Sequence, residues 1–117
     1  MMDMALRAEG LDLNILTYRV LPTSPDAGLI EIVMDSETVH EINRGKKMSL
    51  SNWILKHNEQ EPIVSVRDRF MRSLAAYCVM TYLLGIGDRH LENIMVTHNG
   101  NLFLYCPFSC IFYCHLV

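Results

Sequence analysis

Four residues whose side chains could carry out phosphoryl transfer stand within six positions of one another: Asp88, Arg89, His90 and Asn93. This reaction needs a group that handles the proton of the attacking hydroxyl, a cation that offsets phosphate charge, and oxygen ligands for Mg²⁺. Asp88 or His90 could accept the proton. Arg89 could stabilise the phosphate, and the Asn93 amide oxygen suits a hard cation. Alternatively, Asp88 could cap a turn in an ordinary polar loop, with Arg89 paired to Asp88 or Glu92.

A long helix is predicted immediately before this loop. Apolar residues recur at helical spacing over residues 65–84, and Ser65 with Asp68 resembles a capping box. The final turns are apolar on nearly all sides, which predicts a buried helix. Gly85 and Gly87 then interrupt the pattern, so we expect the helix to end there and the polar loop to begin.

A hairpin is predicted after the loop. Residues 94–97 and 101–104 are short apolar runs, and the turn between them contains Asn99-Gly100, a dipeptide suited to tight hairpins. A buried helix before the loop and a hairpin behind it favour a catalytic loop over an ordinary polar one.

The first half of the chain predicts a hairpin followed by helices. The expected elements are a short helix (1–8), a strand (11–21), a turn (22–28), a largely buried strand (29–33) and two helices (36–44 and 49–58). Ser36 is the expected cap of the first of those two helices and Gly45 its end. This order of elements predicts an α+β fold with the layout of a kinase lower lobe, and the connection between the lobes near Val33.

The length and composition of the chain limit the classes of protein to which it can belong. A chain of 117 residues has room for one small core, and 50% hydrophobic with 20% charged residues suits a globular domain. The net charge is −3 and no basic block stands out, which argues against a nucleic-acid partner. No signal peptide precedes the four cysteines, so a reducing, cytosolic setting with free thiols is expected.

The loop resembles that of the phosphatidylinositol 3-/4-kinases and their protein-kinase relatives, G-x-G-D-R-H-x-x-N followed by an apolar triplet, which reverses the H-R-D order of ordinary protein kinases. The matching residues are Gly85, Gly87, Asp88, Arg89, His90 and Asn93. Residues 73–84 look like the helix before that loop in class III (vacuolar-sorting type) phosphatidylinositol 3-kinases. Residues 18–21 and 28–33 look like their strand, turn and hinge. The resemblance covers roughly residues 11–103 and implies a partial protein-kinase-like fold.

The resemblance also implies a site for ATP with Mg²⁺, which Mn²⁺ could replace. Asp88, Arg89 and His90 match the catalytic residues of the family, and Asn93 matches its Mg²⁺-binding asparagine. The implied adenine-binding residues are Glu31 and Val33 through their backbone, Ile30 at the back of the pocket, Tyr18 in its inner part, Ile32 as a wall and Met95 as the floor. From spacing alone, Tyr18, Ile30, Ile32 and Met95 could equally be core residues.

The sequence departs from the family pattern after Phe103. The family continues H-I-D-F-G, whereas this chain continues Leu104-Tyr105-Cys106. Cys106 stands where the Mg²⁺-binding Asp belongs, and a neutral thiol is a poor ligand for a hard cation. Neither the phosphate-covering loop nor the ATP-binding Lys of an upper lobe is found. We therefore expect residues 1–103 to be part of a lipid-kinase catalytic domain, residues 104–117 to be an aberrant apolar tail, and the chain alone to be inactive.

The implied function of the parent enzyme is phosphoryl transfer from ATP to the inositol ring of phosphatidylinositol in membranes. Regulatory or accessory subunits and a cytoplasmic location, peripherally on endosomal or other internal membranes, follow from the same resemblance. Ile32 and Leu91-Glu92 stand where the protein-kinase relatives tend to have Trp and Pro-Ser, which favours a lipid substrate. A fragment of a phosphatidylinositol 4-kinase or of a related protein Ser/Thr kinase, and a non-catalytic pseudokinase piece, remain alternatives.

Overall fold

The computed structural model describes residues 2–24, 27–87 and 90–105. The elements are α1 (Met2–Ala8), β1 (Val20–Ser24), β2 (Ala27–Ile30), β3 (Ser36–Thr38), the π-helix η1 (Glu41–Gly45), α2 (Leu50–His57), α3 (Ile63–Leu83), β4 (Ile94–Thr97) and β5 (Leu102–Leu104). Helices combined with antiparallel strands confirm the predicted α+β class. Within the described residues, no helix is both long enough and apolar enough to span a bilayer.

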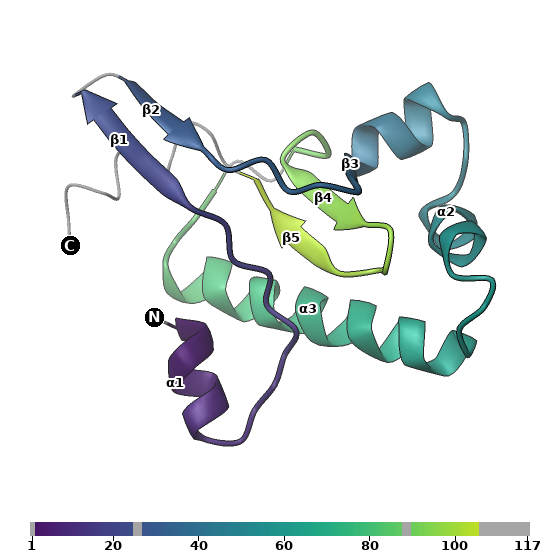
Figure 1. The fold of residues 1–117 in the computed structure, drawn as a ribbon, viewed down its shortest axis with the longest axis horizontal. Helices are drawn as coiled ribbons and strands as arrows, with labels where there is room; N and C mark the ends of the chain where they lie inside the picture. Colours follow the sequence, from purple (N-terminus) through teal and green to yellow (C-terminus); the bar gives the residue numbers. More distant parts are fainter. Residues whose placement is uncertain (1, 25–26, 88–89, 106–117) are drawn as a thin grey trace.

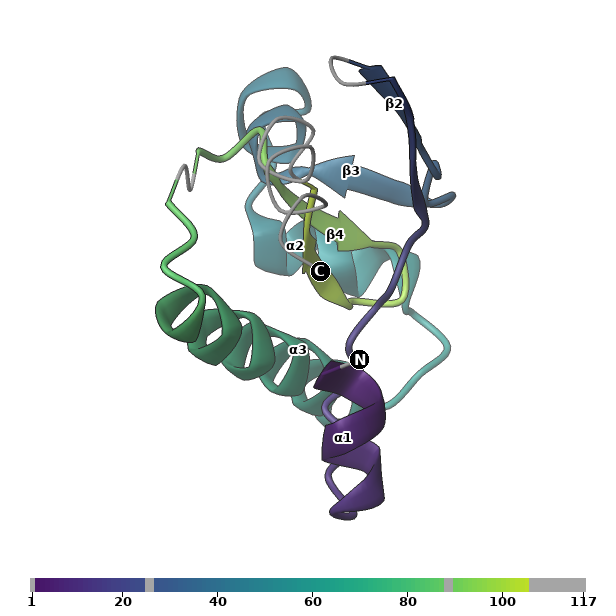
Figure 2. The ribbon, with the colours of Figure 1, turned by 90° about the vertical axis from the view of Figure 1, so that its left-hand side faces the viewer.

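The strands form two small antiparallel sheets (Figure 1). β1 pairs with β2 in a two-stranded sheet, and β4 is the central strand of a three-stranded sheet between β3 and β5. α3 runs along the β4–β5 hairpin, while β2 projects away from α3 (Figure 2). The predicted hairpins at both ends of the chain are therefore confirmed, and the loop predicted to be catalytic connects α3 to the central strand.

The core lies between α2, α3 and the three-stranded sheet. Its buried hydrophobic side chains include Ile42, Trp53, Val66, Val96 and Phe103. Ser73, which is 0% exposed, joins α3 to β5 because its hydroxyl accepts a hydrogen bond from the Leu102 amide at 3.0 Å. The α3–β5 contact thus combines apolar packing with a buried polar anchor that sets the position of the hairpin on the helix.

At the two ends of α3, the sequence signals for the start and the end of the helix can be compared with the structure. Pro62 occupies the N-cap, so the helix begins before the predicted capping box, and Ser65 lies inside its first turn. At the other end, the amides of Gly85 and Ile86 donate to the carbonyls of Tyr82 and Thr81, and Gly85 has a φ of 61°. This is a Schellman motif, in which glycine adopts the left-handed conformation without a Cβ clash.

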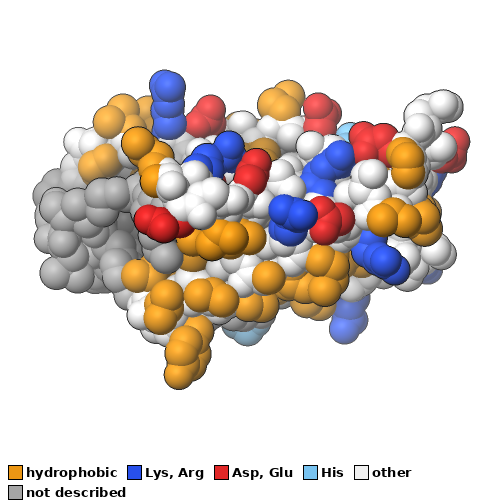
Figure 3. Space-filling view, turned by 90° about the horizontal axis from the view of Figure 1, so that it is seen from below, with side chains coloured by type: hydrophobic (Ala, Val, Ile, Leu, Met, Phe, Trp, Pro, Cys, Tyr) orange, Lys and Arg blue, Asp and Glu red, His pale blue; other side chains and the backbone are white. Residues whose placement is uncertain are grey.

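The prediction that α3 is buried on nearly all sides was wrong. Val66, Ser73 and Ala76 face the core, whereas Met71, Val79 and Leu83 are exposed and Tyr82 is 86% exposed. Seen from below, hydrophobic side chains gather on the underside of the molecule, where α3 runs in Figure 1 (Figure 3). The helix packs one stripe against the β4–β5 hairpin, and apolar composition alone does not determine which faces have a neighbour.

Four predictions in the first half also need correction. Residues 11–19 do not form a strand: the Asp12 carboxylate accepts the Asn14 amide at 3.0 Å, and Asn14 has a φ of 53°. This local side-chain bond competes with an extended ladder. β1 continues through Pro22 to Ser24, so the predicted turn is shorter, and β2 is largely exposed rather than buried.

The predicted helix at residues 36–44 is the fourth correction. Ser36 does not cap a helix; it begins β3 and pairs with Thr97, and its hydroxyl donates to the Val33 carbonyl at 2.7 Å. The helical part is displaced to η1, where the Lys46 amide donates to the Glu41 carbonyl at 2.8 Å. Pairing with β4, far along the chain, overrides the local helix signal.

Stability should fall at alkaline pH because of Tyr77. Its hydroxyl donates to the Leu16 carbonyl at 2.8 Å, and burial raises the pKa of this phenol above its ordinary value of 10.0. The folded state therefore holds the proton more tightly than the unfolded state, so this stabilisation is complete below about pH 10 and is lost as the pH rises further. Urea denaturation at a series of pH values should show the free energy of unfolding decreasing above pH 10.

Tyr77→Phe should flatten that decrease, since the variant cannot titrate at this position. The variant should also lose about 0.5–1.5 kcal/mol at neutral pH because the Leu16 carbonyl loses its partner. Tyr82→Phe, which alters an exposed phenol on the same helix, is the matched control. An unchanged alkaline slope in Tyr77→Phe would contradict the assignment.

Candidate active site

The loop between α3 and β4 holds two of the predicted site residues in described positions. The Asn93 amide donates to the His90 carbonyl at 2.9 Å, and the Asn93 carbonyl accepts the Tyr105 amide at 2.9 Å. From the other side of the loop, the His40 amide donates to the Leu91 carbonyl at 3.1 Å. The backbone of the loop is thus held from two sides before it enters β4. Asp88, Arg89 and Cys106 lie outside the described residues, so their predicted roles stay predictions.

Met95 and Tyr18 are both neighbours of Phe103. Met95 in β4 is directly opposite Phe103 in β5, so their side chains project to the same face of the sheet. The Tyr18 ring contacts the Phe103 ring edge-on, with 6.3 Å between centroids, and its hydroxyl donates to the Leu104 carbonyl at 2.9 Å. Because Tyr105 bonds Asn93, the end of β5 connects the predicted inner-pocket aromatic residue, adenine floor and metal-binding asparagine.

The predicted hinge residues follow β2 in an extended segment. Ile30 ends β2 opposite Val20 and is half-buried, whereas Ile32 is 75% exposed. The Glu31 amide donates to the Arg19 carbonyl at 2.9 Å, and its carboxylate accepts the Arg19 amide at 2.8 Å. The Glu31 side chain therefore fixes the start of the hinge, a role that its position in an apolar strand did not predict.

One cavity of about 320 Å³ lies beside the hinge. It is lined by Leu16, Val33, Met34, Asp35, Thr97, His98 and Asn99. Among the described residues, its lining includes a single predicted adenine-binding residue, Val33. Tyr18, Ile30, Ile32 and Met95 are not among the residues that line this cavity.

The described residues do not complete a Mg²⁺ site. Mg²⁺ requires near-octahedral oxygen coordination, usually from one or two carboxylates together with phosphates and water. Within residues 2–24, 27–87 and 90–105, no group of three or more His, Cys, Asp or Glu side chains could hold a metal ion. The group that contacts the Asn93 backbone from the end of β5 is the Tyr105 amide, which is not a metal ligand. The next residue in the sequence, Cys106, carries a thiol. One amide oxygen does not fit the ion by itself.

Comparison with known proteins decides the family. The model of the family "Phosphatidylinositol 3- and 4-kinase" matches residues 1–104. The chain belongs to the phosphatidylinositol 3- and 4-kinase family. It is therefore part of a lipid-kinase domain, as the catalytic-loop motif predicted.

Several curated relatives of this lipid-kinase chain are phosphatidylinositol 3-kinases by name. Phosphatidylinositol 3-kinase 1 of Dictyostelium discoideum is 42% identical over 113 residues, which is 88% of this chain and 7% of the relative. Phosphatidylinositol 3-kinase piki-1 of Caenorhabditis elegans is 37% identical over 87% of this chain and 7% of its own length. Phosphatidylinositol 3-kinase pik3 of Schizosaccharomyces pombe is 37% identical over 88% of this chain and 14% of its own length. The chain thus spans only a small part of these relatives.

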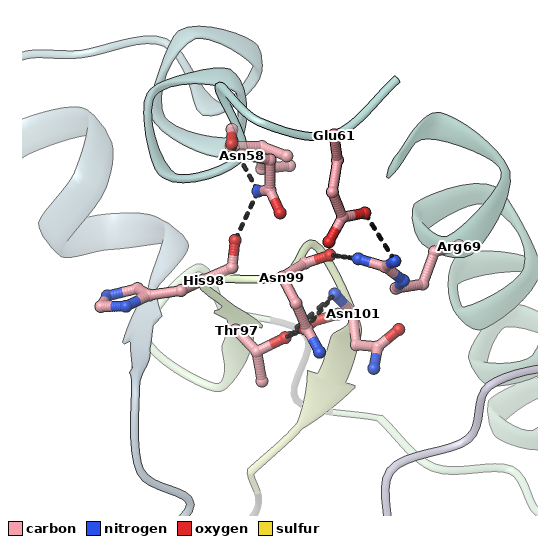
Figure 4. Close-up of polar contacts among 8 residues, drawn as sticks. Asn58, Glu61, Arg69, Thr97, His98, Asn99 and Asn101 are labelled. Carbon is pink, nitrogen blue, oxygen red and sulfur yellow. Dashed lines mark hydrogen bonds and ion pairs between the residues drawn. The ribbon is translucent and has the colours of Figure 1, made fainter. Parts of the chain in front are cut away.

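A polar cluster that sequence reasoning missed anchors the hairpin of this lipid-kinase chain (Figure 4). The side-chain amide nitrogen of Asn58, at the end of α2, donates to the Ile54 carbonyl at 2.7 Å and to the His98 carbonyl at 2.6 Å. The Arg69 guanidinium on α3 donates to the Asn99 carbonyl and pairs with Glu61 at 2.8 Å. Asn58 carried a weak signal as a helix-ending residue, but no local pattern predicts its second partner.

Proposed function

We propose that this chain supplies the hinge and the catalytic loop of a phosphatidylinositol 3-kinase. The observation that carries the proposal is the link between Tyr18, Met95 and Asn93 through Phe103, Leu104 and Tyr105, at the end of the β4–β5 hairpin opposite its turn. The names of the relatives support position 3 of the inositol ring. The resemblance of residues 73–84 supports class III within that group.

In the proposed reaction, the inositol hydroxyl oxygen attacks the γ-phosphorus of ATP and ADP leaves. Asp88 or His90 takes the hydroxyl proton, while Arg89 balances the charge on the transferred group. The described contacts give the chain's own contribution: the His40 and Tyr105 backbone amides hold the loop backbone just before it enters β4, so that His90 and Asn93 keep a defined position relative to Met95. Positioning of this kind is most of what a protein contributes to phosphoryl transfer.

ATP with Mg²⁺, a phosphatidylinositol-containing membrane and accessory subunits belong to the proposal for the parent enzyme, as does a peripheral location on internal membranes. The 117-residue chain alone is proposed to be inactive, because Cys106 replaces the carboxylate that would share the metal with Asn93.

A chimera tests the proposal. Residues 11–103 would replace the matching segment of phosphatidylinositol 3-kinase 1 of Dictyostelium discoideum, with that protein's own continuation after Phe103. Transfer of labelled phosphate from ATP to phosphatidylinositol vesicles should persist. A second chimera that also carries Cys106 should lose roughly a hundredfold or more in Mg²⁺-dependent turnover.

Two results would count against the proposal. A first chimera with a normal thermal melt but no lipid phosphorylation would show that this hinge and loop do not support the reaction. Equal turnover in the two chimeras would remove the argument from Cys106 while leaving the catalytic-loop assignment intact.

A further inference from the structure

The turn between β4 and β5 contains Asn99-Gly100, a dipeptide with chemistry of its own. Glycine has no Cβ, so its backbone nitrogen can approach the side-chain amide of the preceding asparagine. Gly100 has a φ of 90°, and a Cβ built there would lie 3.2 Å from a Val66 methyl group on α3. The turn therefore requires glycine, and it rests against the helix through a buried backbone.

We infer that Asn99 is a deamidation site whose reaction the folded turn suppresses, and that Arg69 is one of the residues that suppress it. This inference does not depend on the proposed kinase function. It rests on the contacts of the turn with its own strands and with α3 (Figure 4).

The chemistry needs only water. The Gly100 backbone nitrogen attacks the side-chain carbonyl carbon of Asn99, and a five-membered succinimide ring forms. The bond from that carbon to the side-chain nitrogen breaks, and ammonia leaves with the proton from the Gly100 nitrogen. Water then opens the ring at either carbonyl, giving an aspartate or an isoaspartate whose main chain runs through the former side chain. Asparagine is known as a thermolabile residue for this reason.

Both reacting groups are occupied in the folded turn. The Gly100 amide donates to the Thr97 carbonyl at 2.9 Å, which directs its nitrogen away from the Asn99 side chain. The Asn99 side-chain oxygen accepts a hydrogen bond from the Thr97 hydroxyl and lies 3.4 Å from the Asn101 amide. Ring closure requires Asn99 to rotate out of these bonds, so the turn must open first.

Arg69 opposes that opening from outside the hairpin. Its guanidinium donates to the Asn99 main-chain carbonyl and is itself oriented by Glu61. This carbonyl and the attacking Gly100 nitrogen belong to the same peptide unit, which must change its orientation for the ring to close. The hydrogen bond from Arg69 on α3 therefore restrains the reacting unit directly. Loss of one hydrogen bond of this kind corresponds to about a two- to tenfold change in an opening equilibrium.

The two products should affect the hairpin differently. An aspartate at position 99 keeps an acceptor for the Thr97 hydroxyl close to the Arg69 cation. An isoaspartate inserts an extra carbon into the main chain between Thr97 and Asn101, whose mutual bonds of 2.9 and 3.0 Å close the hairpin. The isoaspartyl form should therefore loosen β4.

The experiment follows deamidation of the purified 117-residue chain at 37 °C and pH 7.4. Intact mass reports the gain of about one mass unit, and peptide mapping separates aspartyl from isoaspartyl products. A synthetic peptide of residues 94–104 gives the rate of the open turn. We expect the chain to react about tenfold or more slowly than the peptide, Arg69→Ala to react about two- to tenfold faster than the parent chain, and Asn99→Gln to show no mass gain.

Arg72→Ala is the matched control, because Arg72 lies on the same helix but pairs with Asp68 and the Asp12 carbonyl instead of the turn. Glu61→Gln supplies a milder variant that weakens the Arg69 contact without removing the guanidinium, and it should react faster than Arg72→Ala. Equal rates in the parent chain and the peptide would overturn the inference. So would equal rates in the Arg69, Glu61 and Arg72 variants.

Discussion

Replacing Trp53 by alanine is expected to remove a large part of the chain's free energy of unfolding. The indole is 1% exposed and packs against the rings of His57 and His98, with 4.4 and 5.4 Å between centroids. Removal of a buried aromatic side chain costs roughly 3–5 kcal/mol, and small domains have about 5–15 kcal/mol in total. Urea denaturation followed by circular dichroism measures the loss, since the variant has no tryptophan to report by fluorescence.

Trp53→Phe distinguishes the contribution of ring packing from the effect of the buried indole nitrogen at the same position. The indole nitrogen is buried and has no hydrogen-bond partner among the described residues. Phenylalanine removes that unpaired donor and keeps most of the ring contact, so it should cost much less, about 1 kcal/mol. A loss as large as that of Trp53→Ala would mean that the donor is paired in solution.

Asp88→Ala in the active chimera is expected to lower lipid phosphorylation by roughly 10²–10⁴-fold, the usual contribution of a general base. The reason is that Asp88 is a candidate to take the proton of the inositol hydroxyl. The turnover number should fall while the apparent affinity for ATP changes little, since adenine is proposed to bind at the hinge. Initial rates at several ATP concentrations distinguish these two effects.

Glu92→Gln is the matched control in the same loop. Its side chain is 71% exposed and its carboxylate lies 3.9 Å from the His40 imidazole, an exposed pair that contributes little. Turnover should stay within about twofold of the parent chimera. A comparable loss in both variants would indicate that any change of charge in this loop disrupts its shape, and the assignment of Asp88 as the base would be wrong.

Local signals in the sequence predicted those elements whose cause is local. Ser49 caps α2 by accepting the Asn52 amide, Gly85 ends α3, and Asn99-Gly100 turns the last hairpin. Each depends on a backbone conformation or bond within a few residues. β3 has no such cause, because Ser36 and Thr38 are extended through pairing with β4. A helix signal over the same residues was therefore misleading.

The residues of the candidate site also include some that the sequence predicted and some that it could not predict. The loop motif identified the family, and the resemblance named Tyr18 and Met95, which the fold then brings to one sheet through Phe103. The anchoring roles of Glu31 and Asn58 could not be predicted, because each depends on a partner that only the folded chain supplies. The exposure of Ile32 also depends on its neighbours in space rather than on its residue type.

The hydrogen bond from Tyr18 to Leu104 joins residues 86 positions apart. The central strand of the three-stranded sheet likewise pairs with β3 from the first third of the chain. Contacts of this kind form late, because the chain must close a long loop before they stabilise it. During synthesis on the ribosome, α3 can form as soon as it emerges, whereas the Tyr18 hydroxyl lacks its Leu104 partner until the last hairpin has left the exit tunnel. We expect the nascent chain to stay open at this site until that moment, with the apolar faces of its early segments exposed to chaperones.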